Sequence, residues 1–272
     1  MVTGTERCLT VVSLRYFLKE NQDMHTIYFL FLFLASLLFL AAPPSSAADE
    51  CLQCHEELSQ GTSVHAAVAM GCSTCHSAID AREVPHRKKN RIGKGLSSAQ
   101  PELCYGCHDQ SRFKGKVVHG AVGKRCTGCH NPHASKNAKL LTAEQPYLCY
   151  ACHDKTAFTR RNVHAPVAKG QCTACHSPHA SDNVSLLEKP VQRLCADCHA
   201  DKADGRHILA GYGSNDVHPT RGRPDSLKQG KEFSCASCHS PHSSNGKALL
   251  AIASGNAGDI CLTCHTKIMV RP

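Results

Sequence analysis

The residues best suited to chemistry are cysteine–histidine segments of the form C-x-x-C-H. Nine such segments occur, and they use 18 of the 19 cysteines in this 272-residue chain. Two cysteines at i and i+3 can form thioethers with the vinyl groups on one edge of a porphyrin, and the next histidine then lies beneath the iron. The pattern therefore predicts covalent attachment of nine c-type haems.

In chain order, motifs 1 to 9 are 51–55, 72–76, 104–108, 126–130, 149–153, 172–176, 195–199, 235–239 and 261–265. The expected thioether residues are Cys51, Cys54, Cys72, Cys75, Cys104, Cys107, Cys126, Cys129, Cys149, Cys152, Cys172, Cys175, Cys195, Cys198, Cys235, Cys238, Cys261 and Cys264. The expected proximal iron ligands are His55, His76, His108, His130, His153, His176, His199, His239 and His265.

Other uses of cysteine fit this pattern less well. C-x-x-C also occurs in zinc ribbons and redox dithiols, and an exported cysteine-rich chain can form disulfides. None of these alternatives explains why a histidine follows every copy. Haem attachment is therefore the preferred interpretation.

A second set of histidines matches the motifs in number. These candidate distal ligands are His65, His86, His119, His133, His164, His179, His207, His218 and His242. Four of them follow valine (His65, His119, His164 and His218) and four follow proline (His86, His133, His179 and His242), whereas His207 belongs to neither class. Since every haem needs a second axial ligand, this regularity predicts bis-histidine ligation.

Three of the proline-linked histidines lie only three residues after a proximal histidine, in C-H-x-P-H. So short a segment cannot reach the opposite face of the same porphyrin. Each should therefore bind the iron of a neighbouring haem. Motif 9 has no histidine after it in the printed sequence, so its distal ligand must come from elsewhere, with His207 as a candidate.

The elements that carry these motifs are expected to be short. The chain has no Trp and only 5% aromatic residues, and no stretch shows the periodicity of a long helix or strand. The leucine pairs 140–141, 186–187 and 249–250 each begin seven residues after a proline-linked histidine, and we expect them to pack against porphyrin. The predicted fold is a multihaem cytochrome c with a mostly irregular backbone, short α-helices around a chain of haems, and little or no β-sheet. Without haem, such a chain should be disordered.

The N-terminus is predicted to be a leader, residues 1–48. An apolar run at 27–42 precedes small residues at 46–48, which suits cleavage after Ala48, and a retained anchor is the alternative. Translation can start at Met1 or at Met24. Because c-type haem is attached outside the cytoplasm, we expect a periplasmic or extracellular protein, or one associated with the outer membrane.

Residues 49–272 should form one nonahaem domain of paired motifs. We divide it into unit 1 (51–103), unit 2 (104–148), unit 3 (149–194) and unit 4 (195–260), followed by motif 9. Unit 1 departs from the pattern with His86 and a basic stretch at 87–94, which is a solvated loop or a docking surface. Unit 4 departs through the long segment between His199 and Cys235. We expect docking surfaces or a bend in the haem row at these two places.

The segment C-T-A-C-H-S-P-H-A-S at 172–181, with L-L and then L-C-A-D-C-H at 194–199, resembles the doubled CxxCH family of multihaem cytochromes c, in the broad cytochrome c3-like group. This resemblance covers most of residues 51–265. It implies bis-histidine haems packed in a chain and respiratory electron transfer. It also implies partners such as other cytochromes, membrane redox complexes or an outer-membrane porin, and some multihaem cytochromes polymerise into extracellular filaments.

The leading hypothesis is a low-potential electron carrier with no catalytic residue. One alternative is a reductase of a small oxyanion with one open haem, although no C-x-x-C-K motif and no deficit of histidine supports it. A second alternative is a subunit of a cytochrome filament or porin conduit. The formal net charge of +9 does not indicate nucleic acid binding, because haem propionates offset it.

Overall fold

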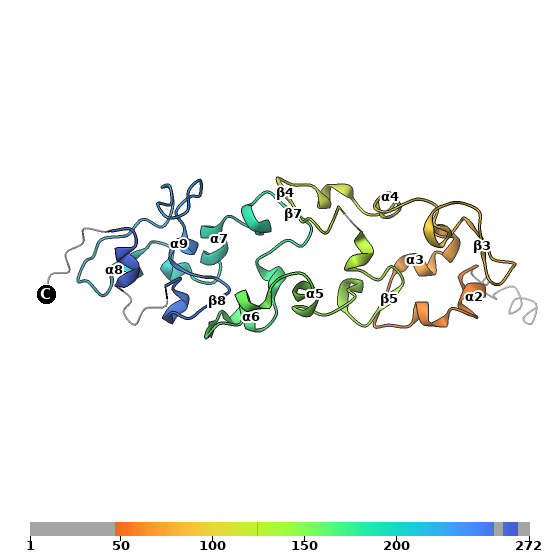
Figure 1. The fold of residues 1–272 in the computed structure, drawn as a ribbon, viewed down its shortest axis with the longest axis horizontal. Helices are drawn as coiled ribbons and strands as arrows, with labels where there is room; N and C mark the ends of the chain where they lie inside the picture. Colours follow the sequence, from red (N-terminus) through yellow and green to blue (C-terminus); the bar gives the residue numbers. More distant parts are fainter. Residues whose placement is uncertain (1–46, 124, 253–257, 266–272) are drawn as a thin grey trace, which may run out of the picture.

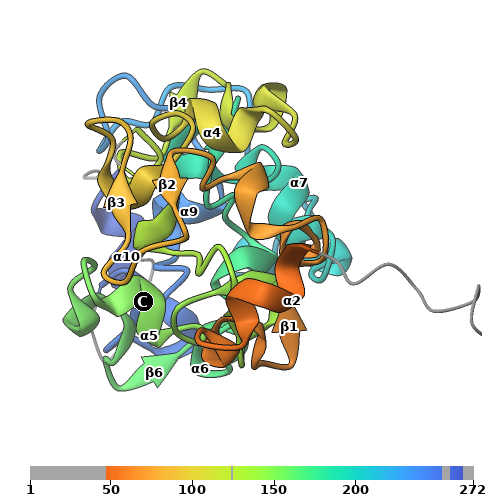
Figure 2. The same cartoon turned by 90° about the vertical axis from the view of Figure 1, so that its right-hand side faces the viewer.

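The computed structural model describes residues 47–123, 125–252 and 258–265. They form an elongated body in which the units follow one another along the long axis in sequence order (Figure 1). Viewed from the end in Figure 2, the chain winds around this axis without forming layers. The apolar run at 27–42 and the residues around Met1 and Met24 lie outside the described residues.

Most elements are single helical turns. The α-helices are α2 (Ala47–Leu52), α3 (Ala66–Ala69), α4 (Glu102–Tyr105), α5 (Tyr147–Tyr150), α6 (Ala165–Ala168), α7 (Val191–Ala196), α8 (Arg206–Leu209), α9 (Cys235–Cys238) and α10 (Asp259–Leu262). The 3-10 turns are η1 (Glu56–Ser59), η2 (Cys72–Thr74), η3 (Gly93–Gly95), η4 (Gln110–Phe113), η5 (Cys126–Gly128), η6 (Ala138–Leu140), η7 (Lys155–Phe158), η8 (Cys172–Ala174), η9 (Val184–Leu186), η10 (Ala200–Lys202) and η11 (Lys247–Leu249).

Each C-x-x-C-H motif overlaps one of these turns. The backbone N–H of its histidine donates to the carbonyl of its first cysteine, as in His55 to Cys51 at 3.0 Å and His176 to Cys172 at 3.1 Å. A helical turn places residues i and i+3 on one face, so both cysteines face the same side. The expectation of short helices around the motifs is confirmed.

The strands are two residues long, and three of the four strand pairs of the described chain cross a boundary between units. They are β1 (Ser63–Val64), β2 (Ile79–Asp80), β3 (Arg87–Lys88), β4 (Val117–Val118), β5 (Ala134–Ser135), β6 (Asn162–Val163), β7 (Ala180–Ser181) and β8 (Ser243–Ser244). β1 pairs with β5, β4 with β7 and β6 with β8, all antiparallel, so each pair joins a unit to the next one. β2 pairs with β3 within unit 1. The expectation of little or no sheet is confirmed.

The described polypeptide has almost no apolar core of its own. Ala134 is its one buried hydrophobic residue, and its other buried non-glycine residues are polar or charged, such as Asp225, Ser243 and Ser244. Large apolar side chains are instead exposed along the body, including Val118 at 48% and Tyr147 at 68%. Burial of apolar side chains against one another therefore contributes little to holding the described body together.

None of the helices in the described ranges is long and apolar enough to span a bilayer.

Candidate haem sites

Every motif histidine faces one histidine of the second set. The ring centroids of these nine pairs lie between 5.8 and 6.5 Å apart. In motif order the pairs are His55 with His86, His76 with His133, His108 with His65, His130 with His179, His153 with His119, His176 with His242, His199 with His164, His239 with His207, and His265 with His218. No histidine of residues 50–265 is used twice or left over in this pairing.

The spacing fits two imidazoles that share one metal ion. A metal–imidazole nitrogen bond is about 2 Å long, so two opposite nitrogens lie about 4 Å apart and their ring centroids about 6 Å apart. Ordinary aromatic pairs also lie at 4.5–7 Å, so the distance by itself does not decide. The decisive point is the one-to-one match, since packing would not select one proximal and one distal histidine nine times.

The histidines do not form larger metal clusters. Within the described ranges, no three His, Cys, Asp or Glu side chains are arranged to hold a metal ion. Two facing imidazoles would suit an iron that a porphyrin holds through its own nitrogens. The residues present therefore fit haem, with thioether cysteines next to each proximal histidine.

The even-numbered motifs share a device that orients the proximal ring. The Nδ1 atoms of His76, His130, His176 and His239 each lie 2.9 Å from a backbone carbonyl, that of Lys94, Lys139, Ser185 and Ala248 respectively. With Nδ1–H donating to the carbonyl, Nε2 keeps its lone pair for iron. This bond also fixes the direction in which the ring points.

These carbonyls belong to an unusual turn that includes the first leucine of each pair. Lys139 and Leu140 have φ of 56° and 57°, and Ser185 and Leu186 have 56° and 58°. Such left-handed backbone costs a non-glycine residue roughly 1–2 kcal/mol. The leucine pairs therefore have a backbone role that their spacing does not reveal, and the expected packing on porphyrin remains a prediction. Their side chains are half-buried.

In unit 1, Gly95 occupies the position of the first leucine, with φ of 62°. A Cβ there would lie 2.3 Å from Cγ1 of Ile79 and 2.9 Å from the carbonyl oxygen of Ala78. Glycine adopts this angle without strain, and the close approach of β2 leaves no room for a Cβ.

Three of the four valine-linked histidines are oriented by the next unit. His65 Nδ1 lies 2.9 Å from the carbonyl oxygen of Pro132, and the His65 backbone N–H donates to the His133 carbonyl at 2.8 Å. The same two contacts join His119 to Pro178 and His179, and His164 to Pro241 and His242. We call this arrangement, with its two-residue strand pair, the joint between two units.

Each joint exchanges histidines between its units. Across the joint of units 1 and 2, His65 of unit 1 faces motif 3 of unit 2, and His133 of unit 2 faces motif 2 of unit 1. The joints of units 2 and 3 and of units 3 and 4 repeat this arrangement. The proline-linked histidines thus lie opposite motifs of the preceding unit, in line with the reach argument from the sequence.

The two ends of the body break this rule. Motif 1 has no preceding unit, and it faces His86 of its own unit. Motif 8 faces His207, which the long segment of unit 4 supplies, and His218 of the same segment faces motif 9. The expectation that His207 serves motif 9 is wrong, because α8 places its ring 6.5 Å from that of His239.

The proline-linked histidines of the joints are half-buried and favour the neutral ring. Burial, followed by the charge of nearby His76, lowers the pKa of His133. Burial also lowers the pKa of His179 and His242, with smaller contributions from His130 and His176. Neutral imidazole is the form that binds iron. Phe113 and Phe158 pack against His179 and His242, with ring centroids 4.9 and 4.8 Å apart.

The cysteines of successive motifs lie next to one another. In unit 2, burial and then the charges of Cys126 and Cys75 raise the pKa of Cys104 to about 11. In unit 3, burial and then Cys172 and Cys129 raise the pKa of Cys149 to about 11. Motif 3 is therefore close to motifs 2 and 4, and motif 5 is close to motifs 4 and 6.

The same contacts continue to both ends of the body. Cys51 of motif 1 hydrogen-bonds with Cys72 of motif 2. A hydrogen bond with Cys235 of motif 8 is the main reason that the pKa of Cys195 in motif 7 is raised. Burial and then the charge of Cys198 in motif 7 raise the pKa of Cys175 in motif 6. Burial and then the charges of Cys264 and Cys261 in motif 9 raise the pKa of Cys238 in motif 8. The attachment edges thus form one unbroken series from motif 1 to motif 9.

The sequence pattern did not reveal two parts of these sites. The proline of C-H-x-P-H supplies a carbonyl to the histidine of the preceding unit, and the leucine pair belongs to a left-handed turn. Both parts recur at fixed distances from their motif. Their recurrence could indicate that they matter, but backbone contacts carry no residue-type signal of their own.

Comparison with known proteins agrees with this geometry. The family model of the doubled CXXCH motif matches residues 65–113, 119–158, 164–204 and 227–270. The first three matches begin at or directly beside His65, His119 and His164, so each spans a valine-linked histidine together with the paired motifs. No curated protein gives a significant match.

Proposed function

Because the chain belongs to the doubled CXXCH motif family and is a multihaem cytochrome c, we propose that it holds nine bis-histidine haems in one row and passes electrons along it. The observation that carries this proposal is the one-to-one pairing of nine motif histidines with nine further histidines. Each haem, once bound, supplies an iron that accepts and releases one electron.

The protein's own residues would hold each haem iron through two neutral imidazoles. An iron held in this way would have no position for a substrate and would need no change of ligands between oxidation states. The carbonyls that bind Nδ1 atoms, such as those of Lys139 and Pro178, hold the rings in place. Imidazole pairs without methionine favour low potentials, and Met70 is 65% exposed.

The order of the row follows from the cysteines. Since thioether cysteines lie on one porphyrin edge, neighbouring cysteines bring neighbouring edges together. The series runs from the Cys51 and Cys72 contact at one end to the Cys238 and Cys261 contact at the other. Electrons would pass from motif to motif in sequence order, along the axis of Figure 1.

As a c-type cytochrome, the protein functions outside the cytoplasm, where such haem is attached. We propose a periplasmic or extracellular carrier whose partners are other cytochromes or membrane redox complexes. A role in a porin conduit or a filament is a second possibility, and it would be seen as assembly of the purified protein in negative-stain microscopy.

The test uses the exported holoprotein. Its mass should correspond to nine haems, and electron paramagnetic resonance of the oxidised resting protein should show low-spin iron throughout. His119→Ala should convert one haem of the nine to high spin, whereas Val118→Ala, one residue earlier, should convert none. A mass short of nine haems, or high-spin iron in the resting wild type, would contradict the proposal in favour of a reductase.

A further inference from the structure

The histidine pair of motif 1 differs from the other eight. His55 and His86 are both exposed, whereas every other pair has at least one half-buried member. Residues 1–50 contain no C-x-x-C-H motif that could form a joint around this pair. The His86 ring is instead carried by a hairpin of unit 1, residues 78–97, which contains β2 and β3.

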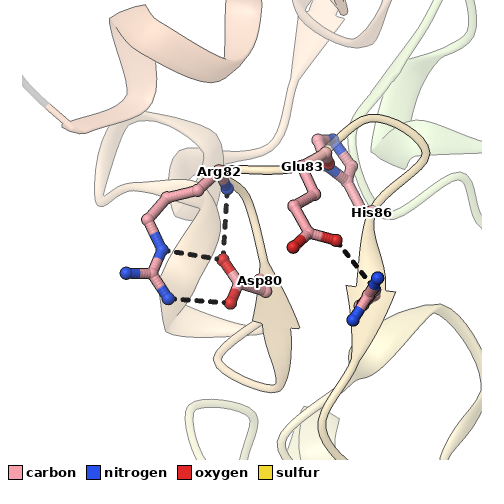
Figure 3. A network of polar contacts seen from close by, with 5 residues as sticks. Asp80, Arg82, Glu83 and His86 are labelled. Atoms are coloured by element: carbon pink, nitrogen blue, oxygen red, sulfur yellow. Dashed lines mark hydrogen bonds and ion pairs between the residues drawn. The ribbon is translucent and has the colours of Figure 1, made fainter.

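The hairpin is held together by its own residues. Arg82 donates to the Asp80 carboxylate at 2.9 and 3.1 Å, which holds the pKa of Asp80 to about 2 (Figure 3). Arg87 pairs with Glu83 at 2.6 Å, and His86 Nδ1 lies 2.8 Å from the Glu83 carbonyl. Among the described residues, every hydrogen bond and ion pair of residues 79–88 has its partner between residues 78 and 95.

Its fixed end lies at motif 2. Lys89 donates to the Ala78 carbonyl and Ala78 to that of Gly95, and Ser97 N–H donates to Cys75. The tip that carries His86 therefore meets motif 1 through the facing ring of His55, while its structure depends on contacts elsewhere. The tip can move away from motif 1 without losing any of its own hydrogen bonds.

The other histidine supplied within its own unit, His207, is braced from outside its helix. Ala203, just before α8, accepts hydrogen bonds from Gln192 of α7 at 2.9 Å and from Thr220 at 3.2 Å. A Cβ on Gly205 would lie 2.1 Å from the His218 carbonyl oxygen, so the segments are in close contact. His207 is exposed as His86 is, but its backbone is not free to move in the same way.

We propose that His86 is an exchangeable ligand and that motif 1 is a binding site for a small neutral diatomic molecule, such as carbon monoxide or nitric oxide, in the reduced protein. In the exchange, the iron–imidazole bond breaks and a bond from iron to the diatomic forms. The imidazole leaves neutral, so no proton or electron is transferred. Iron access, which the distal side controls, is provided here by movement of the hairpin. This inference rests on the proposed function, because it requires a bis-histidine haem at motif 1.

The test is carbon monoxide binding to the fully reduced holoprotein, followed by absorption spectroscopy. We expect a slow adduct with an amplitude of about one haem in nine, limited in rate by loss of His86. Arg82→Ala, which removes the brace of the hairpin, should raise this rate severalfold. Lys189→Ala, which removes an exposed ion pair to Asp197 in unit 4, should leave it unchanged.

The location is tested by His86→Ala. If motif 1 is the site, this variant binds carbon monoxide rapidly, and the amplitude remains one haem in nine. His207→Ala should bind carbon monoxide at two haems, slowly at motif 1 and rapidly at motif 8. An amplitude of two haems in nine for His86→Ala, or no adduct in either the wild type or Arg82→Ala, overturns the inference. A nine-haem, all-low-spin protein without any adduct would leave the proposed function intact.

Discussion

The joints between units and the ends of the body perform the same task in different ways. At a joint, two units exchange histidines, and the valine-linked histidine is oriented by the other unit's backbone, as Pro178 orients His119. At the ends, a unit must supply its own ligand, through the hairpin at His86 or the long segment at His207. The two departures from the repeat are therefore caps that complete the histidine set where no neighbour exists.

This difference predicts which substitutions separate two units and which affect only one histidine pair. Breaking a joint removes a ligand and the contact between two units together. Breaking a cap removes a ligand but leaves the units connected. The following four predictions test this comparison.

The largest effect is expected from the loss of a joint histidine. His179→Ala should produce one high-spin haem and also loosen the joint of units 2 and 3, because Phe113 packs on this ring and β7 begins beside it. We expect the free energy of unfolding to fall by about 2–4 kcal/mol, and we expect new proteolytic cleavage between these units. His207→Ala should produce the same spin change with no such cleavage. Equal cleavage in the two variants would contradict the comparison.

Substitution of Gly95, at the base of the hairpin cap, should destabilise the protein. Gly95→Ala places a methyl group against Ile79 and forces alanine into a left-handed conformation, at a cost of roughly 1–2 kcal/mol. The carbonyl of neighbouring Lys94 orients His76, so the spectrum of the motif 2 haem should also change. Gly93→Ala is the matched control, because nothing lies within 4 Å of its Cβ position. Thermal unfolding and resonance spectra of the two variants would test this.

A smaller effect is expected at the serine of each joint. Ser135 donates to the Leu141 carbonyl at 2.6 Å and accepts from Asn137 N–H at 3.0 Å, which ties β5 to the leucine turn. Ser135→Ala should therefore lower the free energy of unfolding, measured by chemical denaturation, by about 1–2 kcal/mol. Ser59→Ala removes a single exposed bond to Glu56 near motif 1 and should cost less. A larger loss of stability in Ser59→Ala than in Ser135→Ala would contradict this prediction.

The smallest effect is a gain in stability. Ser185 has φ of 56°, and its role in orienting His176 is performed by its backbone carbonyl. Ser185→Gly should remove the left-handed strain and stabilise the protein by less than about 1 kcal/mol, because glycine also loses more entropy on folding. The absorption spectrum should not change. A clear loss of stability would show that the hydroxyl has a role beyond the turn.

The sequence by itself determined the class of fold, and it predicted the attachment sites and the set of distal histidines. C-x-x-C-H is read from adjacent residues, and two periodic classes of histidine need no long-range information. The scarcity of aromatic residues agrees with the near-absence of an apolar core, since Ala134 is the one hydrophobic residue that the described chain buries. The unit boundaries and the leader remain predictions from sequence.

Only the tertiary structure decided which histidine faces which motif. His65 lies closer in sequence to motifs 1 and 2 than to motif 3, yet the pairing of β1 with β5 carries it across the joint to His108. The tertiary structure also gave the irregular units their roles, because His86 and His207 become caps only once it is clear which motifs lack a neighbour. The physical reason is that backbone contacts between distant segments position these rings, and such contacts depend on the path of the chain rather than on residue type.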